Sequence, residues 1–378
     1  MNWIPLGRHS RSRSAAVGVL LALFAASCVA CSDKDATPQV PGPVDGTTTL
    51  LADGRVLLAG GYSGAGTSAT STATLYDPKT DKFTPTGPMT LARASHTATL
   101  LQDGRVLIAG GGNRASGSPT NLTSAELYDP ATGKSTPTGS MQQANSGGMA
   151  VLLKDGRVLV VDTFSHAADL FDPRTGVFSP THTMGDAHDG GAITLLADGR
   201  VLVVGGLDDN LHSLSSSEAY DPSTGYFRPE GSMAAGRTEL TATSLPDGRV
   251  LVVGGQTNYA HTIAYSELFD PKTGVFSASG SMHTPRSMHA AISLADGRVL
   301  ILGGVDAIGR AIATAEVYDP RTGTFSSTGS MGATRYWPAA TILSDGHVFV
   351  AGGQGNATTL QASAELYDPS TGTFSPAG

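Results

Sequence analysis

An Asp-Gly turn followed by a short apolar run recurs seven times along this chain, and it constrains the fold more than any other feature. The turns begin at Asp53, Asp103, Asp155, Asp198, Asp247, Asp296 and Asp345. Their spacings are 50, 52, 43, 49, 49 and 49 residues. A repeat of this length made of short strand-like runs differs from the shorter helical repeats and is typical of a β-propeller array. The chain is therefore expected to fold as one repeat domain rather than as two or three ordinary ones.

Each repeat divides into four predicted strands. The first run is rich in Ala, Thr and Gly, as in 290–294, and small side chains suit the crowded strand nearest a propeller axis. An Asp-Gly hairpin leads into the second run, which is continuously apolar, as in 250–253. Continuous apolar strands are buried on both faces, which is expected when each sheet lies between two neighbours. The third run ends at an Asp-Pro-x-x-Gly turn that begins the short fourth strand.

The third repeat departs from this pattern. Its second run ends at Val161-Asp162, where the other repeats have a glycine pair, and its next loop has only a few residues. We expect this repeat to form a blade with a shortened edge.

The repeats resemble the kelch family in their glycine pair, in the Tyr/Phe-Asp-Pro triplet and in an aromatic residue about six positions later. That aromatic is usually Trp in kelch repeats, whereas here it is Phe, or Ser135 in the second repeat. The Phe positions are Phe83, Phe178, Phe227, Phe276, Phe325 and Phe374. The resemblance covers residues 46–378 and implies an all-β fold, a seven-bladed β-propeller of four-stranded antiparallel blades. Many unrelated activities use this architecture, so the fold alone does not define the function.

The first 45 residues have a different composition. Residues 1–27 combine three arginines with an apolar stretch too short to span a bilayer, which predicts a signal peptide. The small residues before Cys28 resemble a bacterial lipobox, so Cys28 is the predicted lipidation site, with Cys31 as the alternative. An ordinary cleaved signal is the other interpretation. Residues 28–45 are rich in proline and glycine and predict a tether. Each interpretation predicts an exported, extracytoplasmic protein, held in the cell envelope by lipid or secreted.

Charge and cysteine content exclude several functions. The formal net charge is −8, and removal of the three leader arginines makes it more negative, which argues against a nucleic-acid partner. Galactose oxidases, which also use a kelch propeller, hold copper with a cysteine that is cross-linked to tyrosine. The only cysteines here are Cys28 and Cys31, so the resemblance does not extend to that site. The histidines lack metal-binding spacing, and we expect neither a cofactor nor a metal site.

Ligand binding is expected at one end of the blades. The Asp-Gly and Asp-Pro turns should lie together at one end, while loops of variable length lie at the other. These loops are residues 62–72, 112–124, 207–217, 256–264, 305–313 and 354–363. Variable loops on a rigid frame are where binding usually occurs. The predicted function is thus a monomeric binding or scaffolding module for a protein or carbohydrate.

Arginines recur in the connections between repeats, at Arg93, Arg237, Arg286 and Arg335, with Asn145 and His188 at the same place in two other repeats. One interpretation is structural, with each arginine paired to a carboxylate of a neighbouring blade, such as Glu126 or Glu316. The other is a cationic ring at the mouth of the central channel that binds an anionic or carbonyl-rich ligand.

Three more residues are candidates on the same face. Tyr336 and Trp337 follow Arg335, and an exposed pair could stack on a sugar or anchor a peptide. Burial between the first and last blades is the alternative. Glu239 lies two residues after Arg237 and could work beside it as an acid/base pair, as in the sialic acid mutarotases, which also use kelch propellers. A carbohydrate-active enzyme with mutarotase-like or epimerase-like chemistry is therefore the alternative function, although the sequence favours a non-enzymatic protein.

Overall fold

A computed structural model describes residues 45–63, 68–113, 120–257, 261–356 and 360–378. All of these residues belong to one compact unit, Gln39–Gly378. The predicted signal peptide, Cys28, Cys31 and nearly all of the predicted tether lie outside the described residues.

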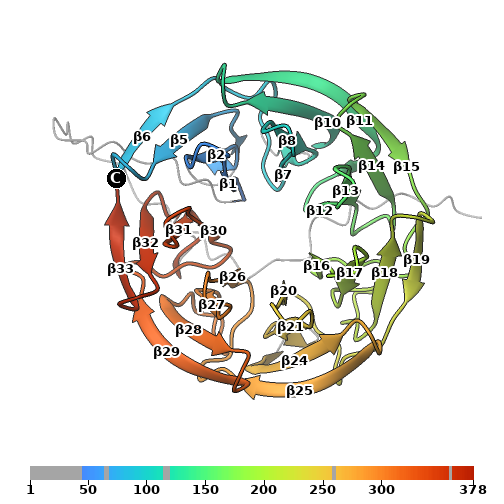
Figure 1. Cartoon of the computed structure of the whole chain (residues 1–378), viewed down its shortest axis with the longest axis vertical. Coiled ribbons are helices and arrows are strands. Elements are labelled where there is room, and N and C mark those ends of the chain that lie inside the picture. The colour runs from blue at the N-terminus through green and yellow to red at the C-terminus, as the bar shows by residue number, and fades with distance from the viewer. Residues whose placement is uncertain (1–44, 64–67, 114–119, 258–260, 357–359) are drawn as a thin grey trace, which may run out of the picture. The chain divides into compact units, whose positions relative to one another are not determined.

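Seven antiparallel sheets form the unit, and each sheet contains four strands in chain order, from the axis outward (Figure 1). The first strands lie nearest the axis: β1 (Thr47–Leu50), β7 (Thr97–Leu100), β12 (Met149–Leu152), β16 (Ala192–Leu195), β20 (Thr241–Ser244), β26 (Ala290–Ser293) and β30 (Ala339–Ile342). The second strands are β2 (Val56–Ala59), β8 (Val106–Ala109), β13 (Val158–Val161), β17 (Val201–Val204), β21 (Val250–Val253), β27 (Val299–Leu302) and β31 (Val348–Ala351).

The third strands are β5 (Ala73–Asp77), β10 (Thr120–Asp129), β14 (Ala168–Asp172), β18 (Ser217–Asp221), β24 (Tyr265–Asp270), β28 (Thr314–Asp319) and β32 (Ala364–Asp368). The outermost strands are β6 (Lys82–Pro85), β11 (Lys134–Asn145), β15 (Val177–Pro180), β19 (Tyr226–Pro229), β25 (Val275–Ser281), β29 (Thr324–Ser330) and β33 (Thr373–Ala377). Short strands in the loops are β3 (Tyr62–Ser63), β4 (Ser68–Ala69), β9 (Gly112–Asn113), β22 (Gln256–Thr257) and β23 (His261–Thr262). The predicted seven-bladed, all-β architecture is confirmed.

The core consists of seven apolar layers, each between two adjacent blades. The second strands supply side chains to both layers that they face. In β2, Val56 and Leu58 pack against blade 7, whereas Leu57 and Ala59 pack against blade 2. Every residue of these strands is buried, which explains why they are continuously apolar.

The ring closes without a shared strand. The sheet β30-β31-β32-β33 and the sheet β1-β2-β5-β6 each consist of strands that follow one another in the chain. Tyr76 of blade 1 stacks on Phe349 of blade 7 with ring centroids 4.6 Å apart. Among the described residues, the terminal blades therefore exchange no strand.

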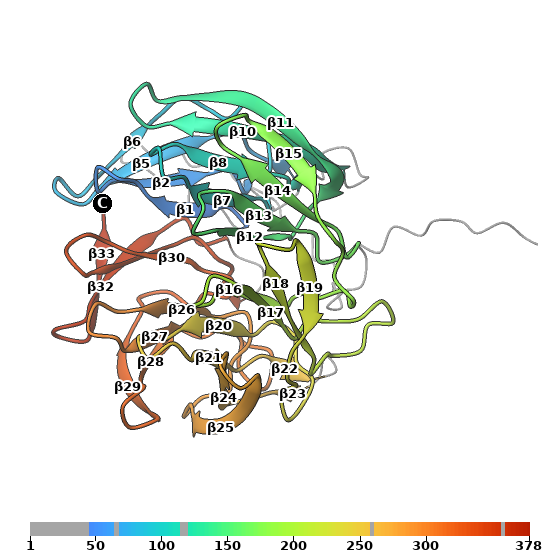
Figure 2. The same cartoon turned by 45° about the vertical axis from the view of Figure 1, so that its right-hand side comes forward.

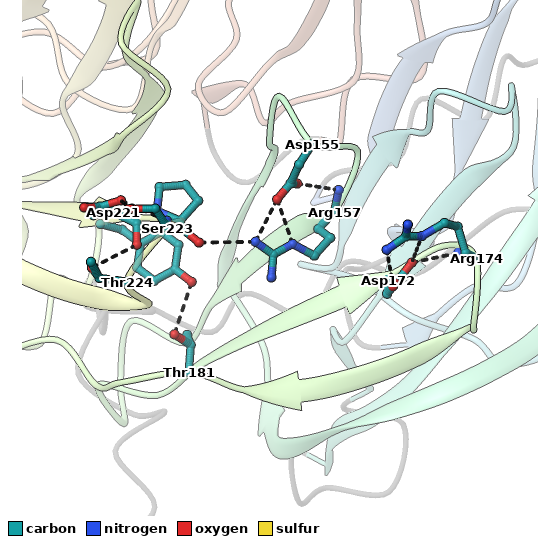
Figure 3. A network of polar contacts seen from close by, with 10 residues as sticks. Asp155, Arg157, Asp172, Arg174, Thr181, Asp221, Ser223 and Thr224 are labelled. Carbon is teal, nitrogen blue, oxygen red and sulfur yellow. Dashed lines mark hydrogen bonds and ion pairs between the residues drawn. The ribbon is translucent and has the colours of Figure 1, made fainter.

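The Asp-Gly and Asp-Pro turns share one end of the blades, which we call the turn face. Gly248, like the other Asp-Gly glycines, has a positive φ (88°), as a tight hairpin requires. The Asp-Gly turns of blades 1 to 4 also connect to the next blade, as Figure 3 shows for Arg157, which pairs with Asp155 at 2.7 Å. The same guanidinium donates to the Pro222 carbonyl of blade 4 at 3.3 Å. His347 replaces this arginine in blade 7.

The second-to-third-strand loops and the connections between blades share the opposite end, which we call the loop face (Figure 2). In blades 2, 4, 5, 6 and 7 an isolated bridge joins this connection to a loop of the same blade, for example Thr238 to Gln256 and Tyr336 to Gln354. The predicted placement of both sets of segments on one face is therefore correct. Among the described residues, no helix is long and apolar enough to cross a membrane.

Candidate functional site

The four predicted arginines lie inside the blades that they precede. Arg93, Arg237, Arg286 and Arg335 are all 0% exposed. Each guanidinium pairs with a glutamate on the third strand of the same blade. The partners are Glu126 at 2.8 Å from Arg93, Glu267 for Arg237, Glu316 at 2.9 Å from Arg286 and Glu365 at 2.8 Å from Arg335. We call these arginine–glutamate pairs the clamps.

Each clamp also satisfies backbone groups at the loop face. The Arg286 guanidinium donates to the Gly303 carbonyl at 3.1 Å and to the Thr314 carbonyl at 2.8 Å. Glu316 accepts the backbone N–H of His283 at 2.8 Å. A clamp therefore ties the incoming connection to the second and third strands of its blade, and the charges compensate each other away from water.

The clamps confirm one interpretation of the arginines and correct the other. The pairing with Glu126, Glu267, Glu316 and Glu365 exists, although each glutamate belongs to the blade that the arginine enters and not to its neighbour. The cationic ring at the channel mouth is wrong for these four arginines, because their guanidinium groups have no exposed surface. Each is buried and paired inside its blade.

The residues two positions after the four arginines, with the equivalent residues of the other three blades, make a different ring around the axis. They are Asp45, Ser95, Gly147, Gly190, Glu239, Met288 and Trp337, which we call the mouth ring. All seven have positive φ, including 56° at Glu239 and 49° at Trp337. Residues other than glycine rarely adopt this backbone conformation, and bulky residues do so least often.

Backbone hydrogen bonds between consecutive blades hold the mouth ring in this conformation. The Ser95 N–H donates to the Asp45 carbonyl at 2.7 Å, and the Gly147 N–H donates to Ser95 at 2.9 Å. Farther round, Glu239 donates to Gly190 at 2.6 Å, Met288 to Glu239 at 3.1 Å and Trp337 to Met288 at 2.8 Å. In the left-handed conformation these N–H groups point toward the preceding blade. The resulting hydrogen bonds stabilise a positive φ even in residues that ordinarily disfavour it.

Glu239 and Trp337 meet at the mouth ring, although blade 6 separates their backbones. The Trp337 indole Nε1–H donates to Glu239 Oε2 at 3.1 Å. Burial raises the pKa of Glu239 to about 7, with help from the charges of Asp189 and Asp45 and against the indole hydrogen bond. At neutral pH this carboxyl is therefore present in both protonation states, and it can donate as well as accept a hydrogen bond.

The predicted pairing of Glu239 with Arg237 is not formed. Arg237 bonds to Glu267 inside blade 5, whereas Glu239 bonds to Trp337 on the axis side of the same connection. The two residues lie two positions apart and would share a side in a fully extended chain, but the left-handed conformation at Glu239 (φ 56°) breaks that alternation and separates the two side chains. An acid/base pair of these two residues is thus contradicted by the geometry.

Tyr336 lies beside Trp337, with ring centroids 5.3 Å apart. Its hydroxyl donates to the Gln354 side-chain oxygen in the adjoining loop. Burial and the charge of Asp45 raise the pKa of Tyr336. Both aromatic side chains are half-buried, which lies between the two predicted states, exposure for binding and burial between the terminal blades.

Two further acidic residues complete this set. Asp45 belongs to the mouth ring, and Asp189 immediately precedes Gly190 of the ring. Burial, together with the charge of Asp162, raises the pKa of Asp189 to about 6. The common offset from the arginine position was the only sequence signal for the ring, because its seven residue types share no chemistry.

The site thus offers carboxyl groups, an indole and a phenol around the axis, supported by backbone hydrogen bonds between neighbouring members of the mouth ring. Such groups suit hydrogen bonding to hydroxyls and stacking against a flat apolar surface. Among the residues with described positions, no group of three or more His, Cys, Asp or Glu side chains is placed to hold a metal ion.

The fold defines the class of protein as a seven-bladed β-propeller, and comparison with known proteins extends this. The kelch motif matches residues 195–234, 285–332 and 338–378. No curated protein sequence matches the chain. The chain is thus a seven-bladed propeller with kelch repeats in these three segments, and the same four-strand blade recurs in all seven repeats.

Solved structures agree in fold. A fungal alcohol oxidase of the AA5 family, in complex with copper, is similar with a TM-score of 0.68 and 18% identity. The match covers 90% of this chain and 77% of that one. A protein named YjhT is similar with a TM-score of 0.58 and 16% identity, covering 77% of this chain and 99% of that one. At this level of identity the likeness concerns the fold alone.

Proposed function

We propose that this propeller is an exported, lipid-anchored binding module that takes a carbohydrate or protein ligand on its loop face, centred on the mouth ring. The observation that carries the proposal is the contact between Glu239 and Trp337, which joins two blades at the axis. A carboxyl with a pKa of about 7 and a half-buried indole in a strained backbone are unusual for a purely structural surface.

The chemistry of the mouth ring suits a neutral, hydroxyl-bearing ligand better than an anion. The four clamp arginines are buried and paired, so they do not supply positive charge there. Asp45, Asp189 and Glu239 supply carboxyl groups, which accept hydrogen bonds from hydroxyls, and Trp337 supplies a stacking surface. This set corresponds to a sugar or to a polar segment of a protein.

Intrinsic fluorescence tests the proposal directly. Trp3 lies in the predicted signal peptide, so Trp337 is the only tryptophan of the processed chain. Ligands from a glycan array and a peptide library would be titrated while Trp337 emission is followed. We expect binding to change the emission and Glu239→Gln to weaken it about tenfold or more, as for a central contact.

Tyr226→Ala is the matched control, because Tyr226 is an aromatic residue 48% exposed on the outermost strand of blade 4. This variant should bind as the wild type does. Ligands that bind without any change in Trp337 emission, or equally well to Glu239→Gln, would place the binding site elsewhere.

The anchor requires its own experiment. If Cys28 carries the lipid, Cys28→Ala moves the protein from the membrane fraction to the soluble extracytoplasmic fraction or blocks its processing, whereas Cys31→Ala changes nothing. The reverse result would assign the lipid to Cys31. Membrane retention in both single variants and in the double variant would contradict a lipid anchor.

A further inference from the structure

Blade 3 replaces both members of the clamp by shorter residues. Asn145 occupies the place of Arg93, four residues before the first strand of its blade. Asp169 occupies the place of Glu126, because Asp169 pairs with Val160 in the same register in which Glu126 pairs with Ile108. The loop-face end of blade 3 therefore has a carboxylate but no guanidinium.

A guanidinium satisfies three acceptors in each clamped blade. In blade 2, Arg93 donates to the Gly110 carbonyl at 2.7 Å, to the Ser124 carbonyl at 3.0 Å and to the Glu126 carboxylate. The equivalent acceptors in blade 3 are the carbonyls of Asp162 and Ala167 and the carboxylate of Asp169. Asn145 does not reach this far, because its amide donates to the Val161 carbonyl at 3.2 Å.

Buried oxygen atoms are left without a partner at this place. Asp169 Oδ2 accepts the Gln142 N–H at 3.2 Å, but Asp169 Oδ1 has no hydrogen bond. Asn145 Oδ1 and Thr163 Oγ1 have none either. The three residues are only 6%, 4% and 1% exposed, respectively. A buried carboxylate without a compensating charge is costly, and clamped blades avoid this cost with arginine.

The chemistry of these atoms defines what would fit them. Asp169 Oδ1, Asn145 Oδ1 and the two carbonyls are oxygen acceptors, and only one of the four belongs to a charged group. Oxygen ligands select hard cations, and carbonyl oxygens can replace the hydration shell of a monovalent ion. The charge of Asp162, which also acts on Asp189, makes the surroundings more negative.

We propose that the loop-face end of blade 3 binds a monovalent metal cation of the Na⁺ or K⁺ class between Asp169 and Asn145, in the place that a guanidinium occupies in blades 2, 5, 6 and 7. The cation compensates the Asp169 carboxylate and ties the connection after β11 to β13 and β14, as the clamps do in their own blades.

Thermal unfolding of the full chain tests this site. The protein is dialysed into choline chloride at pH 8, and NaCl or KCl is then titrated in at constant total chloride. A specific site raises Tm by roughly 2–5 °C with saturation, because a ligand that binds only the folded state stabilises it. A parallel titration with CaCl₂ should give no larger shift. A Tm that is the same in choline and in saturating Na⁺ and K⁺, or one that responds to Ca²⁺ alone, would overturn the proposal.

Two variants separate the site from a general salt effect. Asp169→Asn keeps the shape and removes the charge, so its Tm should not respond to Na⁺ or K⁺. The double variant Asn145→Arg, Asp169→Glu restores the clamp and should be more stable than the wild type in choline and equally unresponsive. Asp209→Asn removes an exposed carboxylate on the same face and should keep the response. A response that persists in Asp169→Asn would contradict the site even if the double variant fails to fold.

Discussion

Blades 3 and 6 differ at one end only. At the turn face both have an Asp-Gly hairpin, with Arg157 or Arg298 bound to the aspartate. At the loop face, blade 6 buries Arg286 against Glu316, whereas blade 3 has Asn145, Asp169 and a shorter loop. The shared turns preserve the blade, and the loop face can change its residues without loss of the fold. We infer that the two ends of a blade have different tasks.

The largest expected difference between the two blades concerns the clamp itself. Arg286→Ala leaves Glu316 buried without a compensating charge and should lower the free energy of unfolding by about 3–5 kcal/mol. Asn145→Ala in blade 3 removes one amide hydrogen bond, to Val161, and should cost about 1 kcal/mol. Urea denaturation of both variants measures the difference.

Arg286→Ala combined with Glu316→Ala is the control for the buried charge. This double variant should recover part of the loss, because no unpaired carboxylate remains. Equal losses for Arg286→Ala and Asn145→Ala would show that the two blades are held together in the same way.

Substitutions at the turn face should cost the same stability in the irregular blade 3 as in a regular blade such as blade 5. Gly156 of blade 3 and Gly248 of blade 5 both have φ near 88°. Valine at either position is strained in the left-handed region and should cost about 1–3 kcal/mol, with ligand binding unchanged. Thermal denaturation and ligand titration of Gly156→Val and Gly248→Val test this, and loss of binding by a stable variant would show that the turn face takes part in recognition.

The contributions of Glu316 in blade 6 and Asp169 in blade 3 to the free energy of unfolding should change with pH in opposite directions. Burial raises the pKa of Glu316, but hydrogen bonds from His283 and Thr284 and the charge of Arg286 outweigh it, so its pKa is lowered. The stability that Glu316 contributes is therefore present above its ordinary pKa near 4.5 and lost as pH falls through the lowered folded value.

The pKa of Asp169 is shifted in the opposite direction to that of Glu316, because burial raises it from 3.8. In choline buffer its contribution is most favourable when it is protonated and is lost as pH rises through 3.8 and the raised folded value. Asp169→Asn should therefore match the wild type at pH 3.5 and exceed it at pH 7, whereas Glu316→Gln is weaker at pH 7 and approaches the wild type in acid. The same pH trend in both variants would remove this distinction between the blades.

The smallest expected effect lies at the turn face of blade 7. Arginine at the position after the Asp-Gly turn reaches the next blade, as in Arg200, which donates to the Pro271 carbonyl at 3.0 Å. His347→Arg should let the side chain reach across to blade 1 and raise stability by about 0.5 kcal/mol, the usual size for an exposed pair. Arg249→His should cost a similar amount in blade 5, and a change above 2 kcal/mol in either variant would mean that these contacts do more than join the turns.

The strands could be predicted from the sequence because their cause is local. Val106–Ala109 lies between an Asp-Gly turn and a glycine pair, and the structure has the same bounds. In blade 3 the predicted place of the glycine pair was wrong by one residue. The register of Met149 with Val161 shows that Asp162 and Thr163 take these positions.

The mouth ring could not be predicted, because its cause is the closed seven-fold arrangement. Glu239 and Trp337 lie 98 residues apart and meet only when the ring is complete. The burial of Arg237 and the other clamp arginines also depends on packing between distant segments, which no local sequence pattern predicts. From the sequence, an arginine beside a variable loop could equally be a binding residue. Only the structure shows that a buried glutamate about 30 residues away compensates its charge.

We conclude that the clamp arginines hold the blades together, and we propose that the mouth ring binds the ligand. The direct test measures Tm and ligand affinity together for Arg286→Ala and Glu239→Gln, using a ligand from the glycan or peptide screen. The account predicts that Arg286→Ala loses several degrees in Tm and still binds below that temperature, whereas Glu239→Gln keeps its Tm and loses affinity about tenfold or more. An Arg286→Ala protein that is stable but no longer binds, beside a Glu239→Gln protein that binds normally, would contradict it.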